Sequence, residues 1–154
     1  MKTLKLTSDQ KGRIHTLAKL LIGIPYKFGA EVQLNLSPPE IKSKGLAFDC
    51  SELVEYLMYH AGVQVPDGSV NQYMACDEVE HEPVEIGDLV FKIGTNAVVG
   101  HVGIICSEAP DIVLEAEGFY GKVIVRELYQ FKAATKNNTY AGRRRFLLAK
   151  IKQI

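Results

Sequence analysis

The spacing of hydrophobic side chains near the start of the chain predicts an amphipathic helix over residues 7–22. Thr7 and Gln10 stand three residues apart, which is the spacing of a capping box in a first helical turn. Gly23 and Pro25 follow the last apolar position and are typical of a helix end. The apolar positions that repeat at helical intervals are Ile14, Leu17, Ala18, Leu21 and Ile22.

A second apolar stripe predicts a helix that begins at Cys50 and ends at Gly62. Asp49 precedes it in the position of an N-cap. Between the two helices, residues 29–48 contain two glycines and two prolines and show no clear period, so we expect a long loop. The members of the second stripe are Leu53, Val54, Leu57, Met58 and Ala61.

The second half of the chain alternates short apolar runs with turn residues, which is typical of strands. A turn at 107–111 predicts a hairpin between the second and third runs. Helices followed by antiparallel strands predict an α+β domain, and 154 residues without an internal repeat predict one domain spanning 1–154. The predicted strands are 87–93, 101–106, 112–116, 122–128 and 146–151.

Composition narrows the range of functions. Eighteen basic and eighteen acidic side chains cancel, which gives no support to nucleic-acid binding as the main function. No apolar run approaches the length of a membrane span, so we expect no integral membrane segment. The first twenty residues lack an apolar stretch of the kind found in signal peptides, so we expect synthesis in the cytoplasm without one.

Three cysteines and four histidines are scattered singly along the chain. No Cys-x-x-Cys or His-Glu-x-x-His spacing occurs, so we predict neither a metal site nor another cofactor. The odd cysteine count also argues against a disulfide framework. We expect Cys76 and Cys106 to be structural thiols.

Cys50 and His101 are the candidates for chemistry. A thiol at the start of a helix feels the positive end of the helix dipole, which favours the thiolate. A lone cysteine is more often simply buried, and a histidine beside Gly100 and Gly103 at the head of a strand could be structural. Together they are the minimum for an activated thiol nucleophile. Glu52 lies about 200° around the helix from Cys50 and should point away from the sulfur.

Six segments, in order along the chain, resemble the NlpC/P60 family of cell-wall cysteine peptidases. The resemblance runs from about residue 24 to about residue 146, nearly the whole chain. Any one match is weak, but six in the family's order are specific. The matching segments are 24–29, 48–51, 65–73, 86–91, 100–104 and 140–144.

This resemblance implies a papain-like fold in which N-terminal helices pack on an antiparallel sheet. It also implies Cys50 as nucleophile, His101 as base and Glu115 as the residue that orients the imidazole. Glu117 shares the strand face of Glu115 and is the alternative, because side chains repeat every two residues along a strand. Tyr26 should lie near the thiol, where a phenol could hydrogen-bond an oxyanion or the sulfur.

Two further residues are implied as substrate-binding. Asp49 and Ser51 flank the nucleophile and in the family often line the subsite for amino or amide groups, although helix capping alone would explain both. The sequence departs from the family pattern at Glu52, where a glycine is usual, at Gly29-Ala30, where the family has two glycines, and at Glu115, where histidine is common.

The function implied is cleavage of peptidoglycan stem peptides at γ-D-glutamyl or diaminopimelyl bonds, at the bacterial cell wall. The small size and the long loop suggest a phage-type lysin or a tail-associated enzyme. The alternatives are an acyltransferase or amidase on the same scaffold, and a non-catalytic wall-binding module. The three arginines at 143–145 read as a solvated turn at a strand edge that could bind anionic wall polymers.

Overall fold

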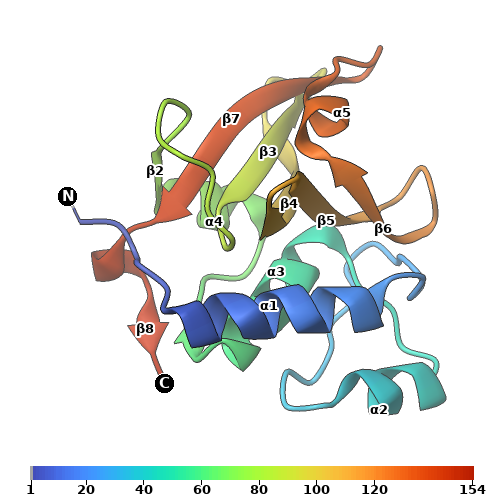
Figure 1. Cartoon of the computed structure of the whole chain (residues 1–154). Coiled ribbons are helices and arrows are strands. Elements are labelled where there is room, and N and C mark those ends of the chain that lie inside the picture. The colour runs from blue at the N-terminus through green and yellow to red at the C-terminus, as the bar shows by residue number, and fades with distance from the viewer. Residues whose placement is uncertain (1) are drawn as a thin grey trace.

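The computed structural model describes residues 2–154 and has the α+β organisation expected from the sequence. Figure 1 shows a curved sheet with two helices, α1 and α3, lying side by side beneath it. The helices are α1 (Ser8–Leu21), α2 (Pro38–Ser43), α3 (Cys50–His60), α4 (Ser69–Met74) and α5 (Leu128–Lys132), with a 3-10 turn at Leu148–Lys150. The strands are β1 (Val63–Gln64), β2 (Cys76–Glu78), β3 (Leu89–Gly94), β4 (Val99–Glu108), β5 (Asp111–Glu117), β6 (Lys122–Glu127), β7 (Asn138–Phe146) and β8 (Lys152–Gln153).

Six strands form one sheet in the order β2-β7-β3-β4-β5-β6, and every neighbouring pair is antiparallel. The hairpin predicted between the second and third runs is confirmed, since Glu108 pairs with Asp111 at its closed end. The two short strands β1 and β8 pair separately. The papain-like arrangement of helices on an antiparallel sheet is therefore confirmed.

Both faces of the central strands are buried. On one face, α1 and α3 pack on a large apolar cluster that includes Phe48, Tyr56 and Phe91. On the other face, α5 covers a smaller cluster centred on Phe131. Burial on both faces explains why the central strands read as continuous apolar runs rather than as alternating patterns.

The two long helices begin where their caps predict. Thr7 and Gln10 form the reciprocal capping box of α1. Asp49 caps α3, its Oδ1 accepting a hydrogen bond of 2.8 Å from the Glu52 amide. Cys50 is therefore the first helical residue of α3, as predicted.

The prediction of a loop over residues 29–48 is wrong in part, because α2 lies within it. Ser37 and Glu40 make a capping box, and Pro38 follows Ser37 at the first helical position, where proline is well tolerated. The two adjacent prolines read as a loop signal, but they occupy the start of this short helix.

The last predicted strand, 146–151, is also wrong. The strand in this region is β7, which ends at Phe146, and residues Leu148–Lys150 form a 3-10 turn. The prediction missed this strand because three consecutive arginines interrupt the apolar pattern by which a strand is recognised.

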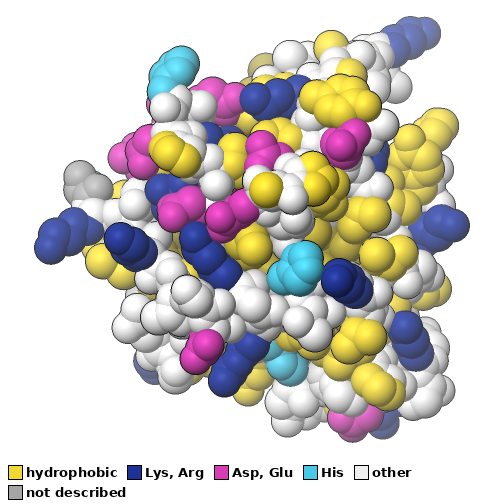
Figure 2. Space-filling view, viewed as in Figure 1, with side chains coloured by type: hydrophobic (Ala, Val, Ile, Leu, Met, Phe, Trp, Pro, Cys, Tyr) yellow, Lys and Arg dark blue, Asp and Glu magenta, His cyan; other side chains and the backbone are white. Residues whose placement is uncertain are grey.

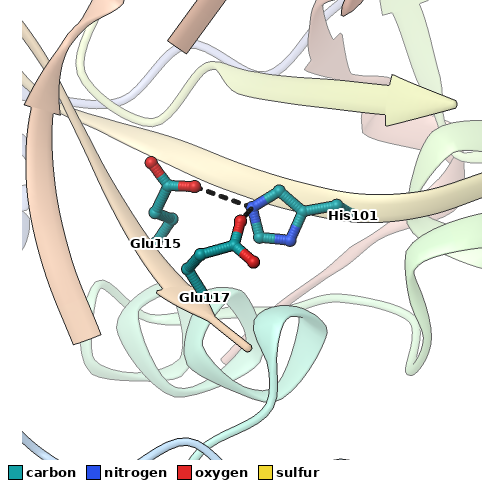
Figure 3. A group of neighbouring side chains, drawn as sticks. All are labelled: His101, Glu115 and Glu117. Carbon is teal, nitrogen blue, oxygen red and sulfur yellow. Dashed lines mark hydrogen bonds and ion pairs between the residues drawn. The ribbon is translucent and has the colours of Figure 1, made fainter. Parts of the chain in front are cut away.

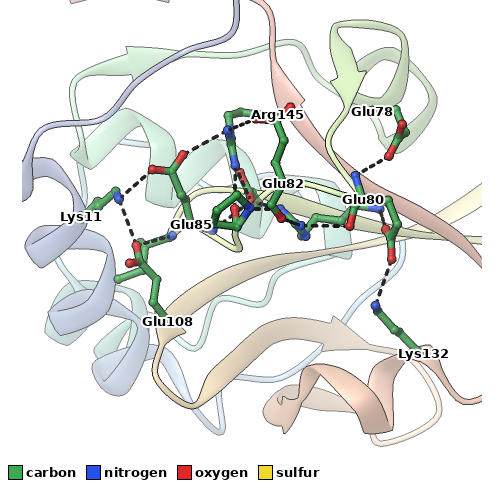
Figure 4. A network of polar contacts seen from close by, with 12 residues as sticks. Lys11, Glu78, Glu80, Glu82, Glu85, Glu108, Lys132 and Arg145 are labelled. Atoms are coloured by element: carbon green, nitrogen blue, oxygen red, sulfur yellow. Dashed lines mark hydrogen bonds and ion pairs between the residues drawn. The ribbon is translucent and has the colours of Figure 1, made fainter.

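The arginines of β7 are not a solvated turn, which corrects the prediction for 143–145. Arg143 and Arg145 are buried, and both bind Asp88, which is 1% exposed. The Arg143 Nη1 to Asp88 Oδ2 distance and the Arg145 Nε to Asp88 Oδ1 distance are both 2.6 Å. Arg144 lies over the ring of Tyr73, with its Cζ 4.1 Å from the ring centroid. Figure 4 shows this network continuing through Glu85 to α1.

The face of the molecule seen in Figure 2 carries acidic and basic side chains interspersed, with no patch of a single sign. Within residues 2–154, no helix combines the length and the apolarity that crossing a membrane requires.

Candidate active site

The thiol of Cys50 lies at the N-terminus of α3, half-buried against the main apolar cluster. Asp49 fixes this helix end through its cap, and its Oδ1 also accepts a hydrogen bond of 3.3 Å from the Ser51 hydroxyl. Ser51 is buried. Asp49 and Ser51 therefore hold each other and the first turn of the helix.

The imidazole of His101 projects from β4 and contacts two carboxylates of β5. Its Nε2 lies 2.8 Å from Glu115 Oε1 and 3.3 Å from Glu117 Oε2. Figure 3 shows both carboxylates on the same side of the ring, which leaves Nδ1 clear of them. The ring of Phe131 of α5 lies nearly parallel to the imidazole, with ring centroids 6.0 Å apart.

The structure brings Cys50 and His101 together. Burial alone would lower the pKa of His101, but its interactions with the nearby Cys50 and Glu115 groups raise it to about 10. A raised pKa means that the imidazolium is favoured at neutral pH. The site therefore favours a charged imidazolium between a thiol and a carboxylate.

Glu115 is fully buried, at 0% exposure, and is held by a second partner. Arg126 of β6 binds it through two contacts, Nε to Oε2 at 2.7 Å and Nη2 to Oε1 at 3.0 Å. Burial raises the pKa of Glu115, but hydrogen bonds from His101 and Arg126 lower it below its ordinary value. Glu115 is thus a buried carboxylate kept ionised by two cationic partners.

Tyr26 lies at the same site. Burial raises the pKa of its phenol, and the negative charges of Cys50, Asp49 and Glu117 raise it further. The ring packs against the turn between β5 and β6, where a Cβ on Gly118 would lie only 3.2 Å from Tyr26 Cε1. The absence of a side chain at Gly118 is what lets the tyrosine approach.

Three residues of this site were missed by sequence reasoning, namely Lys92, Arg126 and Phe131. Lys92 of β3 lies opposite His101, Phe131 of α5 stacks on its ring, and Arg126 of β6 binds Glu115. The Phe131 ring is the common contact, with Lys92 Nζ 4.7 Å and Arg126 Cζ 5.6 Å from its centroid. No local signal in 122–127 indicates Arg126, because its bond to Glu115 on the neighbouring strand is what places it at the site.

Within residues 2–154, two clusters contain side chains of the kind that bind metals. One is His101 with Glu115 and Glu117, and the other is Glu52 with Glu55 and Asp67. In the first cluster the Glu115 oxygens already bind His101 and Arg126.

A helix that begins at a cysteine and packs on an antiparallel sheet carrying a histidine defines the papain-like class of cysteine hydrolases. Residues 23–143 match the NlpC/P60 family, and the chain belongs to this family. Its members are cysteine hydrolases, although some have become non-catalytic.

Three relatives illustrate the range of the family. The chain is 32% identical over 89 residues to gamma-DL-glutamyl hydrolase of Bacillus subtilis, covering 56% of this chain and 19% of that protein. The structure of the peptidoglycan hydrolase RipB from Mycobacterium tuberculosis is similar with a TM-score of 0.65 and 26% identity, over 89% of this chain and 64% of RipB. RipD from the same organism, described as a non-catalytic domain protein adapted to peptidoglycan binding, has a TM-score of 0.63 and 20% identity, over 92% of this chain and 100% of RipD. The chain thus spans about a fifth of the curated relative that it matches.

Proposed function

We propose that this protein is a cysteine amide hydrolase that cleaves stem peptides of peptidoglycan at γ-D-glutamyl or diaminopimelyl bonds. The observation that carries the proposal is the position of His101, which lies between the thiol of Cys50 and the buried carboxylate of Glu115. A wall-binding module has no chemical need for an imidazolium held in this way.

In the proposed mechanism, the Cys50 thiolate attacks the carbonyl carbon of the scissile amide. His101, protonated at Nδ1, gives its proton to the leaving amine, and a thioester remains on the sulfur. Water, deprotonated by the now neutral His101, then attacks the thioester and releases the acid product and the thiol. Glu115 accepts the Nε2–H bond throughout, which fixes the ring and stabilises the imidazolium.

We assign the N-terminus of α3 and Tyr26 to stabilisation of the oxyanion that forms when the thiolate attacks the carbonyl group. Backbone N–H groups at the start of α3 are directed toward the position of the thiol, and the dipole of the helix favours negative charge there. The Tyr26 phenol, close enough to Cys50 and Asp49 to feel their charges, is the side-chain donor that we assign to the same oxygen.

Asp49 and Ser51 are the residues that we assign to substrate recognition. The second carboxylate oxygen of Asp49 has no partner within the described chain, while the first caps α3. A carboxylate beside the nucleophile suits a substrate amino group, as the family resemblance implies.

The substrate class is supported by what similar proteins do. One relative hydrolyses γ-DL-glutamyl bonds and another is a peptidoglycan hydrolase. The action would then take place at the bacterial cell wall, and the phage-type origin expected from the sequence stays a prediction. An acyltransferase on the same scaffold would form the same thioester and differ only in the acceptor that resolves it.

The test is incubation of the protein with purified muropeptides, followed by identification of the products by mass spectrometry. We expect cleavage within the stem peptide by the unmodified protein and none by Cys50→Ala. Thermal denaturation of both proteins serves as the folding control. Intact muropeptides after incubation with the unmodified protein, or equal cleavage by Cys50→Ala, would overturn the proposal.

A further inference from the structure

A cavity of about 450 Å³ opens next to the catalytic histidine, on the side of the ring that faces the carboxylates. Its wall includes Lys92 of β3, Glu117 of β5 and Arg126 of β6, and its rim includes the exposed aromatic side chains of Phe119 and Tyr120. Because Glu117 lines this cavity and also contacts His101, the cavity adjoins the catalytic histidine.

Lys92 is the feature of this cavity that the proposed mechanism leaves unexplained. It is directly opposite His101 on the neighbouring strand and only 2% exposed. Among residues 2–154, no carboxylate lies within ion-pair distance of its ammonium group, and no hydrogen bond holds it. Its nearest defined contact is the Phe131 ring. A buried lysine without an anionic partner is rare, because burial without pairing is costly.

The other charges around the cavity are already matched. Arg126 is bound bidentately by Glu115, and Glu117 lies 3.3 Å from the imidazolium of His101. Burial lowers the pKa of Lys92, and the nearby Arg126 charge lowers it further, although Glu115 and Glu117 act in the opposite direction. Among these cations of the described chain, Lys92 is the one without a carboxylate at ion-pair distance, and it faces a cavity large enough for part of a ligand.

We propose that Lys92 binds a carboxylate of the substrate, and that this group is the free α-carboxylate of a γ-linked glutamyl residue. In a γ-glutamyl amide the side-chain carboxyl group forms the bond, so the α-carboxylate at the other end of the same residue stays free and ionised. Lys92 would then distinguish this residue from its α-carboxamide form, isoglutamine, which has the same shape without the charge. The inference rests on the proposed function and adds to it a determinant of substrate choice.

A matched set of four synthetic tripeptides, L-Ala-γ-D-Glu-L-Lys, tests the inference. The α-carboxylate of glutamate is free or amidated, and the C-terminal carboxylate of lysine is independently free or amidated. We expect kcat/KM to be about 10- to 100-fold higher when the glutamyl carboxylate is free, since a hydrogen bond to a charged group contributes on this scale. A preference that follows the C-terminal carboxylate instead would overturn the assignment to the glutamyl residue.

Variants of Lys92 test whether this residue is the source of the preference for the free carboxylate. Lys92→Met should bring the acid-to-amide ratio of kcat/KM close to one, mainly through KM, and Lys92→Arg should restore part of it. Lys152→Met, at an exposed lysine of β8 outside the cavity, is the matched control and should keep the ratio of the unmodified protein. Because each ratio is internal to one enzyme, a lower folded fraction of a variant does not alter it.

The possible failures are distinguishable. If the unmodified protein cleaves acid and amide forms equally, the carboxylate subsite is wrong and the proposed hydrolase function stands. If it cleaves none of the four, that function loses its support, and calorimetric binding of the same peptides then decides the subsite. Binding of the acid form that is at least tenfold tighter, and that disappears in Lys92→Met, would support the subsite, whereas equal binding or no binding would refute it.

Discussion

The role assigned to Glu115 can be tested by removing its carboxylate, as in Glu115→Ala. The variant loses a buried, charge-assisted hydrogen bond of 2.8 Å to His101, an interaction of about 1.5–3 kcal/mol. We expect kcat to fall by roughly a hundredfold, which corresponds to about 3 kcal/mol of transition-state stabilisation. Glu115→Gln should lose less, because an amide oxygen still accepts the imidazole N–H.

Glu117 limits the size of this effect. Its carboxylate lies 3.3 Å from the same Nε2 and can take over part of the role of Glu115. Glu117→Ala alone should therefore lower kcat only a few fold, while the double variant should lose more than the product of the two single losses. Such coupling is expected when two groups serve one atom.

The pH profile separates orientation of the histidine from a general loss of structure. The hydrogen bond and charge of Glu115 help to raise the pKa of His101 to about 10, so removing them lowers that pKa. Since the imidazolium is the active form, the alkaline loss of kcat/KM should move to lower pH in both Glu115 variants. The assay is hydrolysis of a fluorogenic γ-D-glutamyl peptide between pH 5 and pH 10, with thermal denaturation run in parallel.

Glu78→Ala is the matched control, since Glu78 is an exposed strand glutamate on β2 at the opposite edge of the sheet. Denaturation matters because Glu115→Ala also leaves Arg126 without its partner. If Glu115→Ala keeps kcat within a few fold and its alkaline limb does not move, the reasoning is refuted. Cys50 and His101 would then act as a dyad.

Three further predictions follow from burial and charge. Iodoacetamide at pH 6 should label Cys50 before Cys76 or Cys106, because burial raises the pKa of Cys106 to about 11 and that of Cys76 further still. Asp88→Asn should lower the free energy of unfolding in urea by about 3 kcal/mol, because it leaves the buried guanidinium of Arg143 without a carboxylate and removes one of the carboxylates that bind Arg145. Glu55→Gln should raise the melting temperature more at pH 8 than at pH 5. Burial raises the pKa of Glu55 to about 9, so stability falls as pH rises from about 4.3 toward that value.

Each of these has a defined contrary result. The labelled cysteines are identified by mass spectrometry of tryptic peptides. If Cys106 is labelled faster than Cys50, then Cys50 is not the activated thiol. An Asp88→Asn protein with unchanged stability would mean that water reaches the arginines in solution. If Glu55→Gln changes the melting temperature by the same amount at pH 5 and at pH 8, then Glu55 is ionised in the folded protein at both pH values.

The parts of the fold that could be predicted from sequence are those fixed by local signals. The capping box at Thr7 and the cap at Asp49 placed the starts of both long helices, because a cap acts within three residues. The turn at 107–111 likewise fixed the hairpin that carries His101 and Glu115. The period of two along a strand placed Glu115 and Glu117 on one face, and the structure shows both at the same imidazole nitrogen.

What could not be predicted depends on pairs far apart in the chain. Arg143 and Arg145 are charged and were assigned to solvent, yet they are buried because Asp88, more than fifty residues earlier, binds both. Arg126 binds Glu115 across neighbouring strands, and nothing near Arg126 in the sequence indicates this. A buried charge is usually stabilised by a partner elsewhere in the chain, and a single segment does not contain that information.

The departure from the family pattern at Glu52 has a structural explanation of the same kind. Glu52 is buried, and its Oε1 accepts a hydrogen bond of 2.9 Å from the Val32 amide in the loop before α2. A glycine could not make this bond. Glu52 belongs to a row of side chains four residues apart on α3, and side chains at that spacing share one helix face.

All three members of this row bind the backbone of the same loop. The Tyr56 hydroxyl donates to the Leu36 carbonyl at 2.6 Å, and His60 Nε2 donates to the Leu34 carbonyl at 2.8 Å. The helix that begins with Cys50 therefore also fixes the segment that follows Tyr26 in the chain. The helix that carries the nucleophile and the loop at 32–36 are thus bound to each other, so the glutamate at position 52 anchors this loop without adding a group to the chemistry of the site.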